Sequence, residues 1–177
     1  MEKKDLKPAG VFKYFEEICQ VPRPSKKEEK MIAYLKAFGA KHNLETKVDE
    51  AGNVLIKKPA TPGKENLQTV VLQSHIDMVC EKNNDVQHDF LTDPIETEID
   101  GEWLKAKGTT LGADNGIGVA TELAILADDS IEHGPLECLF TVDEETGLTG
   151  AFALQEGFMS GDILLNLDSE DEGEIFI

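Results

Sequence analysis

Positive charge, aromatic residues and cysteine are all scarce in this sequence of 177 residues. Lys and Arg number 17 against 35 Asp and Glu, which gives a formal net charge of −18. Such a charge repels phosphate backbones and anionic lipid heads, so we expect no binding to nucleic acid or to a membrane surface. The three cysteines, Cys19, Cys80 and Cys138, are widely spaced and odd in number, which argues against a disulfide framework.

Long apolar runs and a leader segment are missing as well. No stretch reaches the ~20 apolar residues that a transmembrane helix needs. The start, MEKKDLKPAGVFKYF, is charged and lacks the apolar centre of a signal peptide. These absences predict a cytoplasmic protein. With 40% hydrophobic residues, the chain can still bury one core of substantial size.

Helix-like and strand-like patterns alternate along the chain. Apolar spacing predicts helices over residues 6–21, from Ser25 to Phe38 and over residues 117–127, and Ser25 with Glu28 forms a capping box for the second. Strand-length runs occupy residues 45–48, 54–57, 69–79, 95–99, 103–106, 136–142, 163–167 and 173–177. The alternation predicts the α/β class, a three-layer sandwich with a mixed, mostly parallel sheet.

Three of the predicted strands end in ionisable residues. His75 and Asp77 close the first, Asp143-Glu144-Glu145 follow the second, and Asp168 follows the third. A further acid, Asp114, lies in a glycine-rich turn before a helix. If the strands are parallel, these groups meet at the edge where α/β sheets bind ligands. Clustered carboxylates repel unless a cation holds them, and zinc accepts histidine with carboxylates.

Each of these motifs also has an ordinary structural explanation. His75 and Asp77 share one face of a strand, which fits either a metal-bound imidazole oriented by an acid or a satisfied core histidine. Glu144-Glu145 fits a metal ligand beside a general base, or a solvated turn. Asp114 fits a structural turn, and Asp168 a solvated loop. The residues taken singly leave these alternatives open.

Four blocks of sequence occur together in a fixed order: Ser74-His-Ile-Asp77, Gly112-Ala-Asp-Asn-Gly116, Asp143-Glu-Glu-Thr-Gly147 and Leu165-Asn-Leu-Asp168. In this order they resemble the co-catalytic zinc peptidases, a family that includes aminoacylase, glutamate carboxypeptidase and the cytosolic dipeptidases. The wording of the first two blocks looks closest to the dipeptidases. The resemblance implies hydrolysis of dipeptides, of the Xaa-His type or with broad specificity, by metal-activated water at two zinc ions.

The resemblance also implies the metal ligands. His75 and Asp168 would bind one zinc ion, Glu145 would bind the other, and Asp114 would bridge the two. In this family the peptide bond after the bridging aspartate, here Asp114–Asn115, is usually cis. Aspartate rather than glutamate at position 168 favours dipeptidases and aminopeptidases over many carboxypeptidases and deacylases.

Two further residues receive catalytic roles from the resemblance. Asp77 would orient the imidazole of His75. Glu144 would be the general base that takes a proton from the water and returns it to the leaving amine. General acid–base catalysis of this kind is worth about 10²–10⁴-fold in rate.

Some parts of the family's site have no match in this sequence. The second zinc takes a further histidine from late in the chain, and a lid domain contacts the substrate. His42, His88 and His133 match no family motif and are expected at the surface. We therefore expect residues 1–177 to be the N-terminal portion of a catalytic domain that lacks its lid and C-terminal part, and to be inactive alone.

Several functional points stay open at this stage. Small peptides are the expected partners, and the family often forms homodimers through the lid domain. Manganese or cobalt could replace zinc as the working metal. An N-acyl amino acid deacylase of the same family is one alternative function, and a non-catalytic acidic binding domain that keeps the fold is another.

Overall fold

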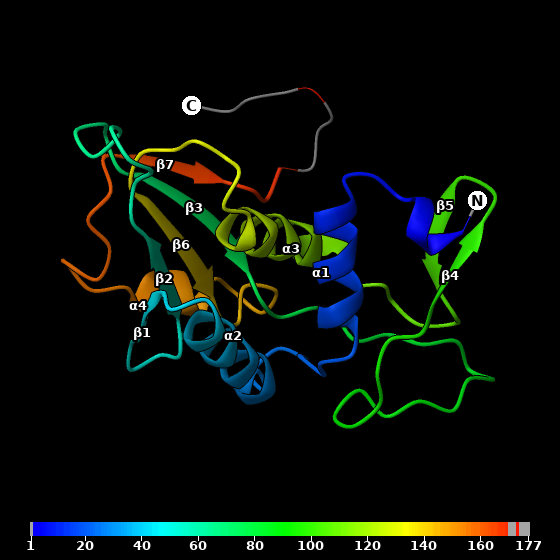
Figure 1. Cartoon of the computed structure of the whole chain (residues 1–177). Coiled ribbons are helices and arrows are strands. Elements are labelled where there is room, and N and C mark those ends of the chain that lie inside the picture. Colours follow the sequence, from blue (N-terminus) through cyan, green and yellow to red (C-terminus); the bar gives the residue numbers. More distant parts are fainter. Residues whose placement is uncertain (1, 170–172, 174–177) are drawn as a thin grey trace.

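The structure, a computed structural model, describes residues 2–169 and 173 (Figure 1). Within this part the helices are η1, a 3-10 helix (Lys3–Asp5), α1 (Ala9–Cys19), α2 (Glu29–Lys41), α3 (Ala113–Ala127) and α4 (Thr149–Ala153). The strands are β1 (Glu45–Val48), β2 (Val54–Lys58), β3 (Val70–His75), β4 (Thr97–Asp100), β5 (Trp103–Ala106), β6 (Leu136–Thr141) and β7 (Ile163–Asn166). The predicted α/β class is confirmed.

A five-stranded mixed sheet, in the order β1-β2-β6-β3-β7, forms the centre of the fold. β3 pairs in parallel with both of its neighbours, β6 and β7, whereas β2 runs antiparallel to β1 and β6. The carboxyl ends of β3, β6 and β7 therefore lie at the same edge, with His75 opposite Thr141. β4 and β5 form a separate two-stranded sheet beyond α1 (Figure 1).

Three helices cover one face of the sheet and enclose the main hydrophobic core. Phe15 of α1, Leu35 of α2 and Leu123 of α3 are all completely or almost completely buried in it. Burying each such side chain contributes about 1.5–3 kcal/mol. The opposite face carries a smaller cluster, built from Leu55, Val71 and Leu139 and covered by side chains that follow α4. The main core, on the face covered by the three helices, packs α3 against β3 and so holds Asp114 near His75.

The second helix begins later than the capping box predicts. Helix α2 starts at Glu29, and no side chain caps it. Lys26 adopts a left-handed backbone with φ of 66°, which interrupts any helix from Ser25. The Ser25 hydroxyl instead donates to Asp77 Oδ2 at 2.7 Å, and Glu28 Oε1 accepts from the backbone N–H of Asp143 at 2.9 Å. The predicted cap was wrong because Ser25 bonds to a distant segment, and Glu28 accepts from Asp143 and from the backbone N–H of Lys26 instead of from Ser25.

The central strand is shorter than the run of residues 69–79 predicts. β3 ends at His75, where its ladder with β6 ends. The apolar alternation continues because Ile76 and Met78 remain buried against the helices. The strand predicted at residues 173–177 lies outside the described residues, apart from Gly173. Every helix in the described part of the chain is too short or too polar to span a lipid bilayer.

Candidate metal centre

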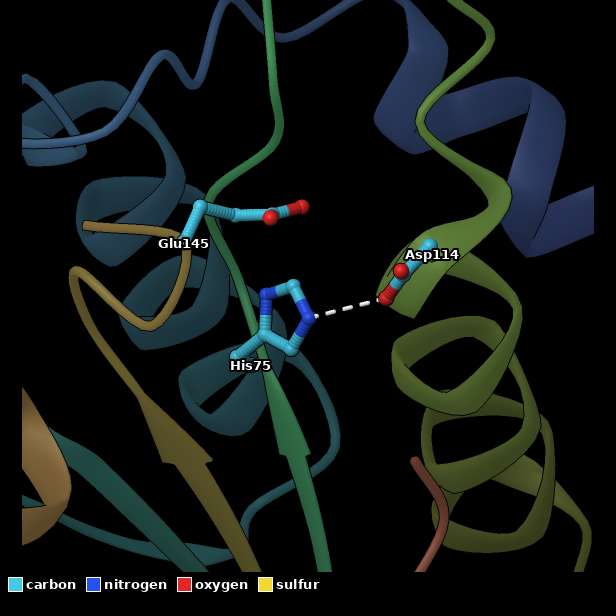
Figure 2. Close-up of side chains that lie close together, drawn as sticks. All are labelled: His75, Asp114 and Glu145. Atoms are coloured by element: carbon cyan, nitrogen blue, oxygen red, sulfur yellow. Dashed lines mark hydrogen bonds and ion pairs between the residues drawn. The ribbon is translucent and has the colours of Figure 1, made fainter. Parts of the chain in front are cut away.

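The sheet topology brings one histidine and several acids to a single edge. His75 is the last residue of β3, Glu144 and Glu145 follow β6, and Asp168 follows β7. Asp114 approaches from the first turn of α3. Figure 2 shows His75, Asp114 and Glu145 pointing toward one another from three different segments. The predicted convergence at the carboxyl ends of parallel strands is therefore present in the fold.

His75 occupies the centre of this edge and is only 1% exposed. Its Nε2 atom lies 3.0 Å from Asp114 Oδ1, 3.7 Å from Asp168 Oδ1 and 3.8 Å from Glu144 Oε2. Burial alone would lower the pKa of His75, but Asp77, Asp168 and Asp114 outweigh burial and raise the pKa to about 9. The surrounding carboxylates thus favour a positive charge at this point.

Asp77 is completely buried behind the imidazole, with Oδ1 3.3 Å from His75 Nδ1. The pair is in ionic contact rather than in aligned hydrogen-bond geometry. The Asp77 carboxylate also accepts hydrogen bonds from the backbone N–H groups of Glu144 at 3.0 Å and Glu145 at 3.2 Å. The Ser25 hydroxyl is its third donor. Burial would raise the pKa of Asp77, yet His75 and these donors hold it down at about 2. One carboxylate therefore ties β3 to the turn after β6.

Asp114 differs from its partners because its side chain is 67% exposed. It lies in the first turn of α3 but has non-helical dihedrals, φ −80° and ψ 116°. The Asp114–Asn115 peptide bond is cis, as the resemblance implies. The side chain of Asn115 donates to Asp168 Oδ1 at 2.5 Å and to the Leu167 carbonyl at 3.1 Å. This amide links the start of α3 to the end of β7.

Glu144 and Glu145 complete the edge, and both are partly buried. Burial and neighbouring carboxylates raise the pKa of each glutamate, although His75 works in the opposite direction. Although they are neighbours in the chain, they belong to two different sets of candidate metal ligands that share His75. Glu145 belongs to the set with Asp114, and Glu144 to the set with Asp168. Within each group the candidate ligand atoms lie within 4.8 Å of one another.

The chemistry of this donor set fits zinc. An imidazole nitrogen and carboxylate oxygens are ligands that zinc accepts, with bonds of about 2.0–2.2 Å. Tetrahedral bonds of that length place neighbouring ligand atoms about 3.4 Å apart, and the 3.0 Å and 3.7 Å separations from His75 Nε2 bracket this value. The carboxylates that raise the pKa of His75 would also attract a bound cation.

A cavity of about 420 Å³ adjoins the centre. Asp114, Asn115 and Asp168 form its polar wall, and Ile117 and Leu167 belong to its apolar wall. Cavities that bind small ligands combine these properties: a mostly apolar lining with a few polar groups that fix orientation.

The other three histidines and the three cysteines lie outside the candidate metal centre. His42, His88 and His133 are partly buried rather than fully exposed, and none joins a metal-type group within the described ranges. The three cysteines are free; Cys19 and Cys138 are buried and Cys80 is partly so. The histidine that would complete the second zinc site is therefore not among the described residues of this chain.

Three residues at the centre escaped the sequence analysis: Arg23, Ser25 and Asn115. Ser25 looked like a helix cap, although its hydroxyl serves Asp77. Asn115 stood inside a quoted motif without a role. Arg23 is 2% exposed and donates to backbone carbonyls on both sides of the centre. Only the glycines at 112 and 116, which leave room for Arg23, could have signalled it.

Comparisons with known proteins agree with this geometry. The chain is 52% identical over 176 residues to the cytosol non-specific dipeptidase of Escherichia coli K12, covering 99% of this chain and 36% of the relative. The crystal structure of aminoacylhistidine dipeptidase from Vibrio alginolyticus superimposes with a TM-score of 0.94 at 56% identity, covering 98% of this chain and 35% of that one. The chain thus spans about a third of the length of these relatives.

A more distant solved structure extends the comparison. An aminopeptidase from Bacillus cereus matches with a TM-score of 0.77 at 26% identity, over 92% of this chain and 43% of that one. The family model described as peptidase family M20/M25/M40 matches residues 71–172, the range that contains His75, Asp114, Glu144, Glu145 and Asp168. The resemblance inferred from the four sequence blocks is confirmed, and the chain belongs to peptidase family M20/M25/M40.

Proposed function

We propose that this chain is the N-terminal portion of the catalytic domain of a dinuclear zinc dipeptidase. The observation that carries the proposal is the convergence of His75 with four carboxylates at one edge of the sheet. The high identity to a dipeptidase along nearly the whole chain supports it. The chain's coverage of about a third of its relatives supports a longer protein that also supplies a lid domain and the missing histidine ligand.

The chain's own residues would divide the metal ligation between them. His75, Asp114 and Asp168 would hold one zinc ion, and Asp114 and Glu145 would hold the other. When bound, zinc supplies Lewis acidity, which polarises the scissile carbonyl and lowers the pKa of a water molecule. Manganese or cobalt would suit the same oxygen and nitrogen donors. Asp114 is suited to bridging because its side chain is largely exposed and one of its oxygens already lies 3.0 Å from His75 Nε2.

Glu144 would move the proton in this reaction. Its pKa is raised from the ordinary value, so its carboxylate can take a proton from the attacking water and return it to the leaving amine. Asp77 would hold the imidazole of His75 in one orientation, since Oδ1 lies 3.3 Å from Nδ1. Asp77 also accepts from the backbone N–H of Glu144 at 3.0 Å, so one carboxylate contacts both residues.

The substrate would be a short peptide with a free amino terminus. The cavity beside Asp114 and Asp168 has room for a small side chain, and Ile117 and Leu167 give it an apolar wall. Aspartate at position 168 agrees with the dipeptidase branch that the resemblance indicates. We further propose a cytoplasmic protein, from the name of the relative in E. coli, and homodimers formed through the lid domain.

Substrate profiling of the full-length protein tests this function. Amino-acid release should be faster from Xaa-His and other dipeptides than from N-acetylated amino acids. The reverse preference would support the deacylase alternative. Hydrolysis of neither class by the zinc-loaded protein would support a non-catalytic binding domain.

A matched pair of variants tests the role of Glu144. In the full-length protein, Glu144→Gln should lower the rate of dipeptide hydrolysis by about 10²–10⁴-fold, while the zinc content stays unchanged. The control is Glu156→Gln, an exposed glutamate on the loop after α4, which should keep the full rate. An unchanged rate in Glu144→Gln would show that this carboxylate is not the general base.

A further inference from the structure

Arg23 is a buried cation whose position the proposed function does not explain. It lies between Pro22 and Pro24 in the segment that joins α1 to α2, and only 2% of it is exposed. A guanidinium in the protein interior loses its hydration, so hydrogen bonds and nearby opposite charge must offset the lost hydration free energy. Asp77 and Glu145 are the carboxylates of the centre whose charge favours the protonated guanidinium.

The hydrogen bonds of Arg23 join the two segments that carry His75 and Asp114. Nη1 donates to the carbonyls of Ile76 at 3.1 Å and Asp77 at 3.0 Å, immediately after β3. Nη2 donates to the Gly112 carbonyl at 2.5 Å, two residues before Asp114. A single planar side chain thus spans the gap between the two ligand-bearing segments.

The glycines that flank Asp114 leave the space that this side chain fills. A Cβ atom at Gly112 would lie 2.6 Å from Arg23 Nη2, and one at Gly116 would lie 2.7 Å from the same atom. Real Cβ atoms do not approach other atoms so closely. Gly116 makes no hydrogen bond to Arg23, so its close approach supports the fit of this turn to the guanidinium independently of the hydrogen bonds.

We propose that Arg23 is a positioning residue that fixes the separation of His75 and Asp114, and through it the affinity of the centre for zinc. The inference rests on the proposed function, because it assigns Arg23 to the same metal centre. The 3.0 Å distance from His75 Nε2 to Asp114 Oδ1 is the quantity that Arg23 sets. Lysine cannot replace it, since an ammonium is a point charge without the rigid fork that reaches both segments.

Zinc affinity, measured by competition with a chromogenic chelator, tests the proposal in the full chain. Arg23→Lys keeps the charge and should weaken zinc binding by about 10–100-fold, the range for residues that orient metal ligands. Gly116→Ala keeps Arg23 but displaces it and should also weaken zinc binding. The absorption spectrum of the Co²⁺-loaded protein should change in both variants, because it reports ligand geometry rather than stability.

Lys58 supplies a matched control. Its side chain is also buried and donates to two carbonyls, those of Ile125 at 3.2 Å and Asp128 at 2.8 Å, but at the opposite end of α3. Lys58→Met should lower the melting temperature while the zinc affinity and the cobalt spectrum stay unchanged. A drop in zinc affinity equal to that of Arg23→Lys would reduce the role of Arg23 to general stability and overturn the proposal.

The outcomes separate this inference from the function on which it rests. If the unaltered chain binds zinc and both folded variants match it in affinity and cobalt spectrum, Arg23 is not a positioning residue and the metal centre stands. If the folded, unaltered chain binds no zinc, both proposals are overturned. Should Arg23→Lys fail to fold, as judged by circular dichroism, Gly116→Ala decides alone.

Discussion

Asp77 and Glu122 are both carboxylic acids with no exposed surface, yet they lie in opposite environments. Asp77, at the carboxyl edge of the sheet, contacts His75 and accepts hydrogen bonds from Ser25 and two backbone amides. Glu122 lies inside α3 beside Ser74 and Cys138, and neither of its oxygens has an aligned hydrogen bond within the described part of the chain.

The difference shows that burial alone does not decide the charge of an acid. Loss of hydration raises the pKa of both groups, but donors and His75 bring Asp77 to about 2, whereas Glu122 stays well above its ordinary value. Asp77 is therefore an anion that ties His75 to the turn carrying Glu144 and Glu145. Glu122 is a neutral acid that interrupts an otherwise apolar interior.

Removing the Asp77 carboxylate should have the largest effect on stability. Asp77→Ala leaves the His75 ring without its ionic partner and the part-buried amides of Glu144 and Glu145 without their acceptor, which should lower the free energy of unfolding by about 3–5 kcal/mol. Urea denaturation at pH 7 measures the loss. Asp85→Ala, at an exposed position, is the control and should unfold like the unaltered chain. Equal stability of the two variants would remove the distinction between Asp77 and an ordinary surface acid.

Neutralising Glu122 should have a smaller effect of the opposite sign, and only at higher pH. The unfolded chain releases this proton above pH 4.5, whereas the folded chain retains it, so stability falls as the pH rises beyond 4.5. The loss of stability ends where the pH reaches the pKa of Glu122 in the folded chain. Glu122→Gln removes this dependence.

Denaturation at two pH values checks the Glu122 prediction. Glu122→Gln and the unaltered chain should be similarly stable at pH 4, and the variant should be more stable at pH 8. A gap of the same size at both pH values would mean that Glu122 does not titrate on unfolding.

The smallest effect is expected from an acid that is paired but exposed. Asp100 forms an ion pair with Lys105 in the β4–β5 hairpin, and the lysine lowers the pKa of Asp100. Water and salt screen such pairs. The free energy of unfolding of Asp100→Asn, measured by urea denaturation, should therefore equal that of the unaltered chain within error. Any remaining difference should shrink in high salt. A large loss would show that burial is not what separates Asp77 from surface acids.

The sequence predicted the strands well because strand formation follows local apolar patterns, whereas the convergence of their ends followed only on the condition that the strands are parallel. Apolar runs located β3, β6 and β7, and strand-end acids indicated which edge would hold the site. The start of α2 was missed because Ser25 and Glu28 imitate a capping box, whereas their partners lie 52 and 115 residues away. Arg23 was missed for the same reason, since its acceptors are backbone carbonyls that no residue type identifies.

The resemblance, rather than the residues alone, supplied the individual roles. Asp114 is exposed and would pass for a turn residue without its cis bond and its contact with His75. Glu144 and Glu145 lie at a turn rather than on an extended chain, and they belong to different groups of candidate ligands around His75.

Zinc binding by this chain, beside an Asp114→Ala control, tests the account most directly. After chelation and controlled re-addition, the unaltered chain should bind a single zinc ion tightly, through His75, Asp114 and Asp168. The Asp114→Ala variant should lose that ion while keeping its fold. A folded chain without specific zinc, or an Asp114→Ala variant that binds zinc as tightly as the unaltered chain, would contradict a metal centre at this edge of the sheet.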